Sequence, residues 1–530
     1  MKKLFALLAA AMLLSLLSAC SSGTGGETQA PSETKAPETT PAEPEPELSD
    51  EELAAHVAEL IDAIYVQKRT DETDAQCAAA KEAWDALTEE QKLLVEGKYA
   101  DYDYFGRDTG DASLDDPRNQ DDIGENEILV VSFGTSFNSS RAADLKGIED
   151  ALAAAFPQWS IRRAFTSQII INHIQARDNE FIDNMDQALE RAVANGVKNL
   201  VVQPTHLMHG AEYDEMCEAV DARRDQFETV RIAEPLLGPV GADATVINAD
   251  KQAVAQYVVA DAVANAGYAS LDEAAADGAA FVLMGHGTSH NAKVTYSQMT
   301  TQMASLGYDN VFIGTVEGEP EETAVENVME AVSAGGYSKV VLRPLMVVAG
   351  DHAENDMAGD DEDSWKSMFL ASGDFESVDC QISGLGSIAA VQQLYVAHTA
   401  EAIYGTLEDG VYTVDFNTDS AMFHVSEACD GKGTLTVENG VMTLHVSLSG
   451  TGYLTVFPGL AADAEKHPEG LIEHTVDTVT YPDGLTEEVH GFDIPVPYIG
   501  ADFDLATLGK KGTWYDHRIS VSNPLPAENS

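Results

Sequence analysis

Hydrophobic positions between residues 127 and 407 follow two alternating patterns. Short continuous apolar runs, bounded by Gly, Pro and Asn, alternate with longer stretches in which apolar residues recur at helical spacing. Runs of the first kind predict strands buried on both faces, and stretches of the second kind predict the helices that connect them. The region therefore has the pattern of βαβ units with parallel sheets. We predict helices at residues 141–156, 179–195, 213–227, 249–266, 322–334 and 389–404.

Two segments of this region share a spacing. In segment 201–216 a Pro is followed six residues later by a Gly, and segment 341–357 has the same arrangement. Two residues beyond each Gly lies a candidate ligand, Glu212 in the first segment and His352 in the second. Each apolar run continues into a Gly turn, so both side chains are expected just beyond the carboxyl end of a strand, where open α/β sheets bind ligands.

Two further pairs of segments indicate an internal repeat. A Gly-Thr-Ser loop follows a predicted strand in each copy, with Phe133 before it in the first and His286 before it in the second. A third pair places Thr166 opposite Glu317. Two copies of one α/β unit explain these pairs, so we predict two similar Rossmann-like halves with parallel sheets. The predicted halves are residues 127–267 and 268–408.

The segment before the repeat has helical patterning. Residues 49–106 carry apolar side chains on one helical face, and a capping-box sequence begins at Thr88. We predict a small helical hairpin whose last helix carries Leu93, Leu94 and Val95. The polar residues 107–126 are predicted to be a linker.

The segment after the repeat changes to short alternating strands. An Asn-Gly pair at 439–440, between two alternating runs, predicts a tight hairpin. We therefore predict an all-β sandwich domain at 409–524, similar in size to an immunoglobulin-like module. Its predicted strands are 411–416, 433–437, 441–448, 453–456, 475–481 and 514–521.

The first twenty residues have the pattern of a secretory signal. Two lysines precede an apolar run over residues 4–17, which is short for a membrane span, and small residues precede Cys20. We predict a lipoprotein signal peptide at 1–20, lipidation of Cys20, and an extracytoplasmic chain anchored to the cell membrane. A transmembrane anchor with an incidental Cys is the alternative. Residues 21–48, rich in Ser, Thr, Pro and Glu, predict a disordered linker.

Charge and cysteine content narrow the range of partners. Lys and Arg total 30 against 89 Asp and Glu, a formal net charge of −59 at pH 7. A field of this sign repels phosphate backbones, so no nucleic-acid partner is expected. The four cysteines beyond Cys20 are far apart and form no C-x-x-C pair, which argues against a zinc–thiolate site and an iron–sulfur cluster.

Three side chains of the second half are candidates for a metal site. His286, Glu317 and His352 each follow a predicted strand. Two imidazoles and one carboxylate suit a divalent metal such as Co, Ni, Fe or Zn with open coordination positions. A single His at a strand end is more often a hydrogen-bonded loop residue, but three such positions in one repeat favour a ligand site. Glu212 is expected to face them across a cleft.

Other polar residues are candidates for binding a ligand. The loop with Thr135 and Ser136 offers hydroxyls and backbone N–H groups at a helix start, although it lacks the spacing of a phosphate loop, so no nucleotide is expected. His206 is either a satisfied core histidine or a second ligand, and His290 is either a loop residue or a proton relay. Four arginines suggest an anionic ligand, with surface charge balance as the alternative: Arg141, Arg162, Arg163 and Arg177.

These residues lie in motifs that resemble a known family. The chain resembles the anaerobic sirohydrochlorin cobaltochelatases, class II chelatases that insert Co²⁺ into a tetrapyrrole without ATP. The motifs that carry the resemblance are segments 131–136, 163–167, 284–290, 316–317, 344–357 and 363–366.

The resemblance implies residue roles. It makes His286, Glu317 and His352 the metal ligands and adds Glu212 to His286 and Glu317 as catalytic residues. The residues implied in substrate binding are Ser132, Thr135, Ser136, Arg163, Thr166, His206 and His290.

The resemblance also implies a function in anaerobic cobalamin biosynthesis. The expected substrates are sirohydrochlorin and Co²⁺, with Ni²⁺ or Fe²⁺ as other metals, and the expected partners include the lipid bilayer and a second copy of the chain. The alternatives are a non-catalytic extracytoplasmic protein that binds a tetrapyrrole, haem or cobalt for uptake, and an adhesion protein with a relic domain. The β domain is similar to surface modules of which some bind haem, where Tyr515 and His517 would be ligands.

Overall fold

The computed structural model describes residues 48–527 except 108 and 465. Residues Ser49–Ser530 form one compact unit. The predicted signal peptide, Cys20 and the linker up to residue 47 lie outside the described residues. Within the described part of the chain, no helix is both long enough and apolar enough to cross a membrane.

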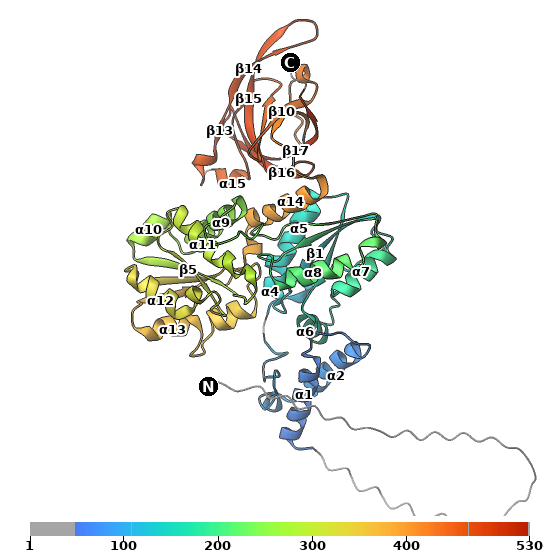
Figure 1. Ribbon diagram of the computed structural model, residues 1–530, viewed down its shortest axis with the longest axis vertical. Helices are drawn as coiled ribbons and strands as arrows, with labels where there is room; N and C mark the ends of the chain where they lie inside the picture. Colours follow the sequence, from blue (N-terminus) through green and yellow to red (C-terminus); the bar gives the residue numbers. More distant parts are fainter. Residues whose placement is uncertain (1–47, 108, 465, 528–530) are drawn as a thin grey trace, which may run out of the picture. The chain divides into compact units, whose positions relative to one another are not determined.

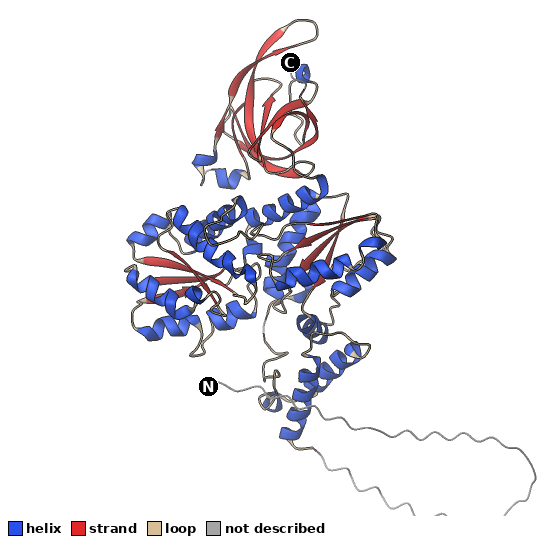
Figure 2. Ribbon diagram, in the orientation of Figure 1, coloured by secondary structure: helices blue, strands red, loops and turns tan. Residues whose placement is uncertain are grey.

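Two parallel four-stranded sheets confirm the predicted α/β class (Figures 1 and 2). The strand orders, β2-β1-β3-β4 and β6-β5-β7-β8, are the same in both sheets, as an internal repeat requires. The first sheet contains β1 (Asn126–Ser132), β2 (Ser160–Phe165), β3 (Asn199–Pro204) and β4 (Thr229–Ile232). The second contains β5 (Ala279–Gly285), β6 (Val311–Thr315), β7 (Lys339–Pro344) and β8 (Ser377–Cys380).

The central strand of the first half is apolar from Ile128 to Val131 because helices cover both of its faces. Ile128 and Val130 belong to one hydrophobic cluster, whereas Leu129 and Val131 belong to another on the opposite face. All seven residues of β5 are buried as well. Continuous apolar runs of this kind are typical of parallel sheets between helical layers.

Helices connect the strands, and several begin or end where the sequence predicts. The helices of the first half are α4 (Asn138–Ser140), the π-helical η2 (Arg141–Leu145), α5 (Lys146–Ala155), α6 (Gln168–Asp178), α7 (Met185–Ala194), α8 (Ala211–Asp221) and α9 (Ala249–Asn265). Those that follow are α10 (Leu271–Ala276), α11 (Val294–Ser305), α12 (Val325–Ala334), the π-helical η6 (His352–Met357), α13 (Trp365–Ser372) and α14 (Ala389–Tyr404). The predicted boundaries of α9 and α14 agree within one residue.

One predicted helix start is wrong. The helix predicted from residue 179 begins at Met185, where Asn184 forms a capping box with Gln187. Asn179 instead ends α6 in a left-handed conformation, with φ of 55°. Asn179 therefore ends a helix that the sequence analysis did not predict, and it does not begin the predicted one.

The last helix of the repeat returns to the first half. α14 contacts α5 and β3. The Tyr395 hydroxyl donates to the carbonyl of Thr205 at 3.0 Å, and the Thr399 hydroxyl donates to the Gln203 side chain at 2.6 Å. These buried bonds join the end of the second half to the centre of the first sheet.

The N-terminal segment is helical as predicted, and we call residues 49–107 the helical module. It contains α1 (Asp50–Ile64), α2 (Thr73–Asp85) and α3 (Glu89–Lys92), and Thr88 forms the expected capping box at α3. The prediction for the last helix is wrong in one respect. α3 ends at Lys92, so Leu93 and Leu94 lie outside it and are exposed, and only Val95 is buried.

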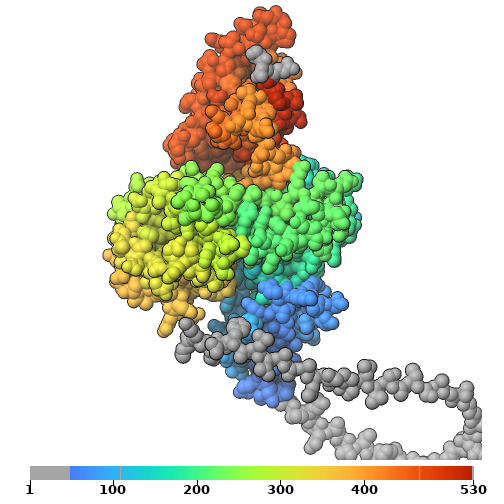
Figure 3. Space-filling view, viewed as in Figure 1, coloured from blue at the N-terminus to red at the C-terminus, as the bar shows by residue number. Residues whose placement is uncertain are grey.

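The C-terminal domain is built on an antiparallel sheet, as predicted, and also contains the short helix α15 (Ala461–Ala464); Figure 3 shows it as a closely packed body in orange and red. Its strands are β9 (Gly410–Thr418), β10 (Lys432–Glu438), β11 (Val441–Ser447), β12 (Tyr453–Phe457), β13 (Ile472–Glu473), β14 (Thr475–Thr480), β15 (Thr486–Val496), β16 (Asp502–Gly509) and β17 (Trp514–Pro526). The predicted hairpin joins β10 to β11, with positive φ at both Asn439 and Gly440.

These strands belong to a single sheet that closes on itself. The two end strands of the sheet are β13 and β14, and only His474 separates them in the chain. The ring of His474 stacks on that of His490 in β15 with centroids 3.6 Å apart. The ends of the sheet therefore adjoin, which makes the domain barrel-like rather than two separate layers.

The arginines of the predicted cluster form ion pairs within the chain. Asp115, from the predicted linker, lies between Arg141 and Arg163 at 2.5 and 2.6 Å, and all three side chains are fully buried. Glu149 pairs with Arg163 from the other side at 2.7 Å. Burial alone would raise the pKa of Asp115, but the hydrogen bonds and charges of the two arginines hold it below its ordinary value.

The other two arginines of the cluster also have carboxylate partners within the chain. Arg162 is buried and pairs with Asp183 at 2.8 Å. Arg177 pairs with Asp178 and donates to the Ser136 carbonyl, each at 2.6 Å. All four arginines are thus paired with carboxylates of the chain itself, so the expectation that they hold an anionic ligand is corrected.

Replacing Asp115 by Ala is expected to lower the free energy of unfolding by about 3–5 kcal/mol, because it removes a shared partner from two buried guanidinium groups. The matched control, Glu125→Ala, removes the surface partner of Lys198 and is expected to change stability by less than about 1 kcal/mol. Urea denaturation followed by circular dichroism measures both variants. Equal effects would contradict the structural role given to Asp115.

Candidate functional site

His286 and His352 meet at the carboxyl-end edge of the second sheet. His286 directly follows β5, and His352 lies at the start of η6, beyond the loop that follows β7. Their ring centroids are 4.7 Å apart with the rings nearly perpendicular, at 78°. Two residues distant in the sequence are thus brought together as predicted.

Hydrogen bonds leave the same nitrogen free on each ring. His286 Nδ1 lies 2.8 Å from the Gly287 carbonyl oxygen, and His352 Nδ1 lies 2.6 Å from Asp356 Oδ2. A carbonyl and an ionised carboxylate only accept, so each Nδ1 carries the proton and donates it. Each Nε2 then keeps a lone pair that can accept a proton or bind a metal, and Asp356 orients one ring from behind.

Glu317 lies beside this pair but not within it. Its backbone N–H donates to the His286 carbonyl at 2.9 Å, and its side chain is exposed. In the described residues, no three His, Cys, Asp or Glu side chains converge closely enough to hold a metal ion. The third ligand position of Glu317 therefore stays a prediction.

The backbone register changes one pairing of the repeat. Glu317 N–H bonds the His286 carbonyl, and the matching bond in the first half runs from Ser167 N–H to the Phe133 carbonyl at 3.2 Å. Ser167, rather than the predicted Thr166, is thus the counterpart of Glu317. The alignment of the two copies from sequence was shifted by one residue here, because a short strand end has too few patterned positions to define the register.

The first half places Glu212 at the position that His352 occupies in the second. Glu212 is in the first turn of α8 and is half-exposed, and its Oε2 lies 3.7 Å from His206 Nε2. Partial burial and the neighbouring Glu215 raise the pKa of Glu212. Its charge also contributes to the raised pKa of Tyr296, whose hydroxyl accepts the N–H of Gly287 beside His286.

His206 and His290 occupy different environments. The side chain of His206 is buried, neither ring nitrogen has a hydrogen-bond partner, and burial lowers its pKa to about 4. His206 is therefore a neutral base at physiological pH. His290 Nε2 lies 3.4 Å from Asp214 Oδ2 in α8, so this residue of the second half faces the first.

The other predicted substrate-binding residues are mostly internal. Ser132 and Thr205 share a hydrogen bond at 2.5 Å, and the Thr135 hydroxyl accepts the N–H of Phe137. Thr166 has a buried hydroxyl without a partner. Ser136 is partly exposed, whereas Arg163 is fully buried between two carboxylates and cannot reach a ligand in this arrangement. The substrate-binding role of Arg163 is corrected accordingly.

The first half holds the loop that carries His352. Asp144, in η2, accepts a hydrogen bond from Ala349 N–H at 2.9 Å, and the Ser140 hydroxyl donates to the carbonyl of the same residue. The sequence analysis missed both residues because they lie inside a helix and belong to no motif. Asp144 is buried, and burial raises its pKa to about 7 against the opposing effect of the backbone N–H of Ala349.

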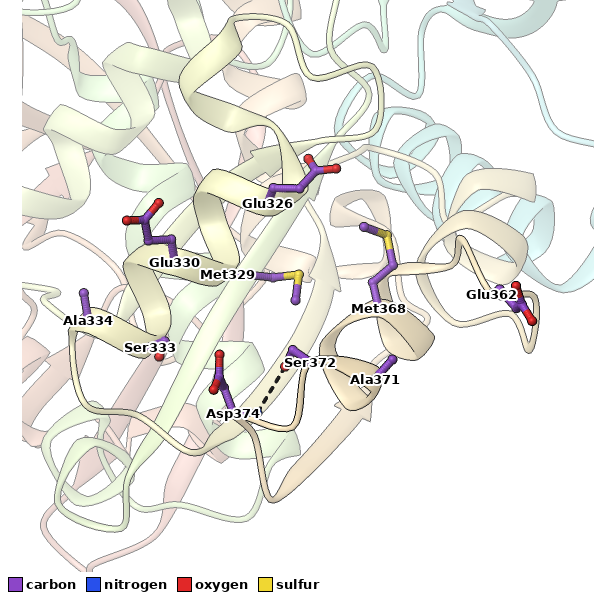
Figure 4. A pocket seen from close by; sticks show the side chains of 10 residues that line it. All are labelled: Glu326, Met329, Glu330, Ser333, Ala334, Glu362, Met368, Ala371, Ser372 and Asp374. Atoms are coloured by element: carbon purple, nitrogen blue, oxygen red, sulfur yellow. Dashed lines mark hydrogen bonds between the residues drawn. The ribbon is translucent and has the colours of Figure 1, made fainter. Parts of the chain in front are cut away.

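Two other features lie away from this edge. A surface hollow of about 750 Å³ between α12 and α13 is lined by residues such as Met329 and Met368 and contains none of the predicted site residues (Figure 4). In the β domain, His517 Nδ1 lies 3.1 Å from Asp419 Oδ1, and Tyr515 is half-exposed on the same strand. Haem binding by these two residues stays a prediction.

Two α/β halves of one topology, with a pair of imidazoles beyond the strand ends of the second half, define a two-domain protein of the chelatase type. The family model described as cobalt chelatase (CbiK) matches residues 126–404, and the chain belongs to this family. The chain is 33% identical over 282 residues to a protein of Salmonella typhimurium named sirohydrochlorin cobaltochelatase, covering 53% of this chain and 98% of that one.

A second relative and a solved structure are also similar to the chain. The chain is 31% identical over 248 residues to sirohydrochlorin cobaltochelatase CbiKC of Nitratidesulfovibrio vulgaris, covering 46% of this chain and 80% of that one. Among solved structures it is similar to SirB from Bacillus subtilis with Fe³⁺, at 14% identity and a TM-score of 0.37, over 53% of this chain and 96% of that one. A TM-score this low adds nothing about function.

The pKa of Asp144 predicts a pH dependence of stability. Because the pKa in the folded state is raised to about 7, the folded chain binds this proton more tightly than the unfolded chain, and the stabilisation is lost as the pH rises through about 7. The amide that Asp144→Asn introduces does not titrate, so the variant is expected to lose less stability than wild type between about pH 5 and 8. Urea denaturation across this range measures the difference. Parallel pH profiles would contradict a buried Asp144, and Asp150→Ala, on the exposed face, serves as the control.

Proposed function

We propose that this chain is a sirohydrochlorin cobaltochelatase, which inserts Co²⁺ into the tetrapyrrole without ATP in anaerobic cobalamin biosynthesis. The observation that carries the proposal is the His286–His352 pair, with both Nε2 atoms free, in a member of the cobalt chelatase family. The names of the two relatives support the substrate and the metal.

The chemistry requires bases and a loosely held metal on one side of the macrocycle. Two pyrrole N–H protons must leave while Co²⁺ exchanges its waters for ring nitrogens. The free Nε2 atoms of His286 and His352 can each hold the metal or accept a proton, and the hydrogen bond to Asp356 orients the ring of His352. Glu317, exposed beside His286, supplies a flexible carboxylate.

The opposite side of the site belongs to the first half. Glu212 holds a proton more readily than an ordinary carboxyl, and His206 is neutral, so both can take part in proton removal from the ring. Imidazole and carboxylate ligands suit Ni²⁺ and Fe²⁺ as well as Co²⁺, so we propose that the choice of metal follows from supply as much as from the site.

We further propose that the chain works outside the cytoplasmic membrane, anchored through a lipidated Cys20. The support is the sequence pattern of residues 1–20, namely two lysines, an apolar run and small residues before the Cys. The position implies that the enzyme meets tetrapyrrole and cobalt that lie outside the cell or cross its envelope.

Replacing His286 or His352 by Ala is expected to lower the rate of cobalt insertion by about 10²-fold or more, because each change removes a base and a metal ligand. The full chain is mixed anaerobically with sirohydrochlorin and Co²⁺, and the change in absorbance on metallation gives the initial rate. His467→Ala, which removes an exposed histidine of the β domain, is the matched control. Wild-type rates in both site variants would contradict the proposed roles.

Replacing Cys20 by Ser is expected to abolish lipidation, because the thiol is the acylated group. The expected result is a shift of the chain from the membrane fraction to the soluble or secreted fraction, together with loss of the acyl mass from the N-terminal peptide. A variant that still fractionates with the membrane would favour an uncleaved transmembrane anchor instead.

A further inference from the structure

The helical module is fixed to α6, the helix that begins at the carboxyl end of β2. Asn172 in α6 donates to the Ile64 carbonyl at 2.8 Å, and its own carbonyl accepts from Cys77 Sγ at 3.5 Å. Tyr104 stacks on His173 with ring centroids 4.4 Å apart. These buried contacts attach the module to the first half over a packed surface rather than through a flexible tether.

The module reaches the edge of the candidate site at two points. Gln67 Oε1 accepts the N–H of Gln168 at 3.2 Å, directly after Ser167, the counterpart of Glu317. Arg107, at the end of the module, places a guanidinium nitrogen 3.7 Å from Oδ1 of Asp351, the residue before His352. The module therefore lies beside the strand ends of the first half and beside the loop that carries His352.

The helical module also carries an aromatic pair, of which Tyr65 lies two residues before Gln67. The rings of Tyr65 and Tyr99 stack with centroids 4.0 Å apart and planes 13° apart. Asp62 holds the turn beneath Tyr99 by accepting hydrogen bonds from the backbone N–H groups of Lys98, Tyr99 and Ala100 at 2.7 to 3.0 Å. Tyr99 is nevertheless 41% exposed, so a rigid aromatic surface faces outward.

Charged groups lie near this pair. Burial raises the pKa of Tyr65, and the negative charge of Asp351 adds to that rise. Lys98 Nζ lies 4.4 Å from the centroid of the Tyr99 ring, and its interaction with that phenol raises the pKa of the lysine. Arg107 also pairs with Asp103 at 3.2 Å, but its side chain is 37% exposed next to Asp351, whereas Arg141 and Arg163 of the first half are fully buried in ion pairs.

We propose that the helical module forms an outer wall of the tetrapyrrole site, with the Tyr65–Tyr99 pair packing against the macrocycle and Arg107 and Lys98 binding its carboxylate side chains. Planar aromatic surfaces and cations match a flat ring that carries acetate and propionate groups. The family match begins at residue 126, after the module, so this wall is an addition to the family core. The inference rests on the proposed function for the identity of its ligand.

A binding titration without metal tests this wall. Sirohydrochlorin is added anaerobically to the full chain, and its fluorescence gives the Kd. Tyr99→Ala and Arg107→Gln are each expected to weaken binding about tenfold, whereas Tyr99→Phe keeps the aromatic face and binds like wild type. Tyr102→Ala and Lys81→Gln are the matched controls, since Tyr102 is 60% exposed outside the stack and Lys81 pairs with Asp85 on α2.

The outcomes separate this inference from the proposed function. Unchanged affinity in Tyr99→Ala and Arg107→Gln, equal losses in the controls, or no binding by wild type would each overturn the wall. The titration contains no cobalt and needs no turnover, so the cobalt-insertion rate of wild type is an independent measurement. Binding that depends on Tyr99 and Arg107, without any insertion of cobalt, would refute the chelatase and retain the wall.

Discussion

Parallel strands of one sheet direct their carboxyl ends to the same edge, and every candidate ligand of the second half depends on this constraint. The backbone bond from Glu317 to the His286 carbonyl fixes two of these residues to neighbouring strand ends. The third, His352, arrives through a longer loop, so its position needs further support. Asp144 and Ser140 supply that support from the first half by binding the N–H and the carbonyl of Ala349. The site is therefore assembled by both halves although its histidines come from one.

The same framework explains how the two halves differ in chemistry. Both halves keep the strand order and the turn that follows the central strand, so a change of side chain at a fixed position changes function without changing the fold. Phe133 stands where the second half has His286, and Glu212 stands where it has His352. The second half thus presents two imidazoles beyond its strand ends, and the first presents a carboxyl with a raised pKa. Their different side chains suit two sides of one macrocycle.

The chain is strongly acidic overall, but several of its arginines lie in the interior. The chain carries a formal net charge of −59, yet Arg141, Arg162 and Arg163 of the first half are buried, and Asp115 pairs with two of them. A buried guanidinium without a carboxylate partner destabilises the fold far more than an exposed one does. The ion pairs of these arginines therefore stabilise the fold. An acidic substrate must then find cations elsewhere. Arg107, at the edge of the helical module, is one such group, which gives an accessory segment a reason to adjoin the site.

The sequence was sufficient for the α/β repeat, the all-β domain and the meeting of His286 with His352, because apolar runs and motif spacing determine strands and their ends. It was insufficient where a contact between residues distant in the sequence determines the structure. Asp115 looked like a linker residue, since nothing local shows that it enters a core. α11 buries Gln298 and Gln302 among its apolar core residues, and the sequence analysis did not predict this helix. The one-residue error at Thr166 arose because only the hydrogen-bond register separates it from Ser167.

The central claim is that the chain is a catalyst and not a carrier. It is tested most directly by the amount of cobalt–sirohydrochlorin formed per chain when both Co²⁺ and sirohydrochlorin are in large excess, corrected for the spontaneous reaction. We expect product to keep accumulating linearly beyond one equivalent per chain. Product that stops at one equivalent, or that forms no faster than without protein, would contradict catalysis and leave a protein that only binds its tetrapyrrole or its metal.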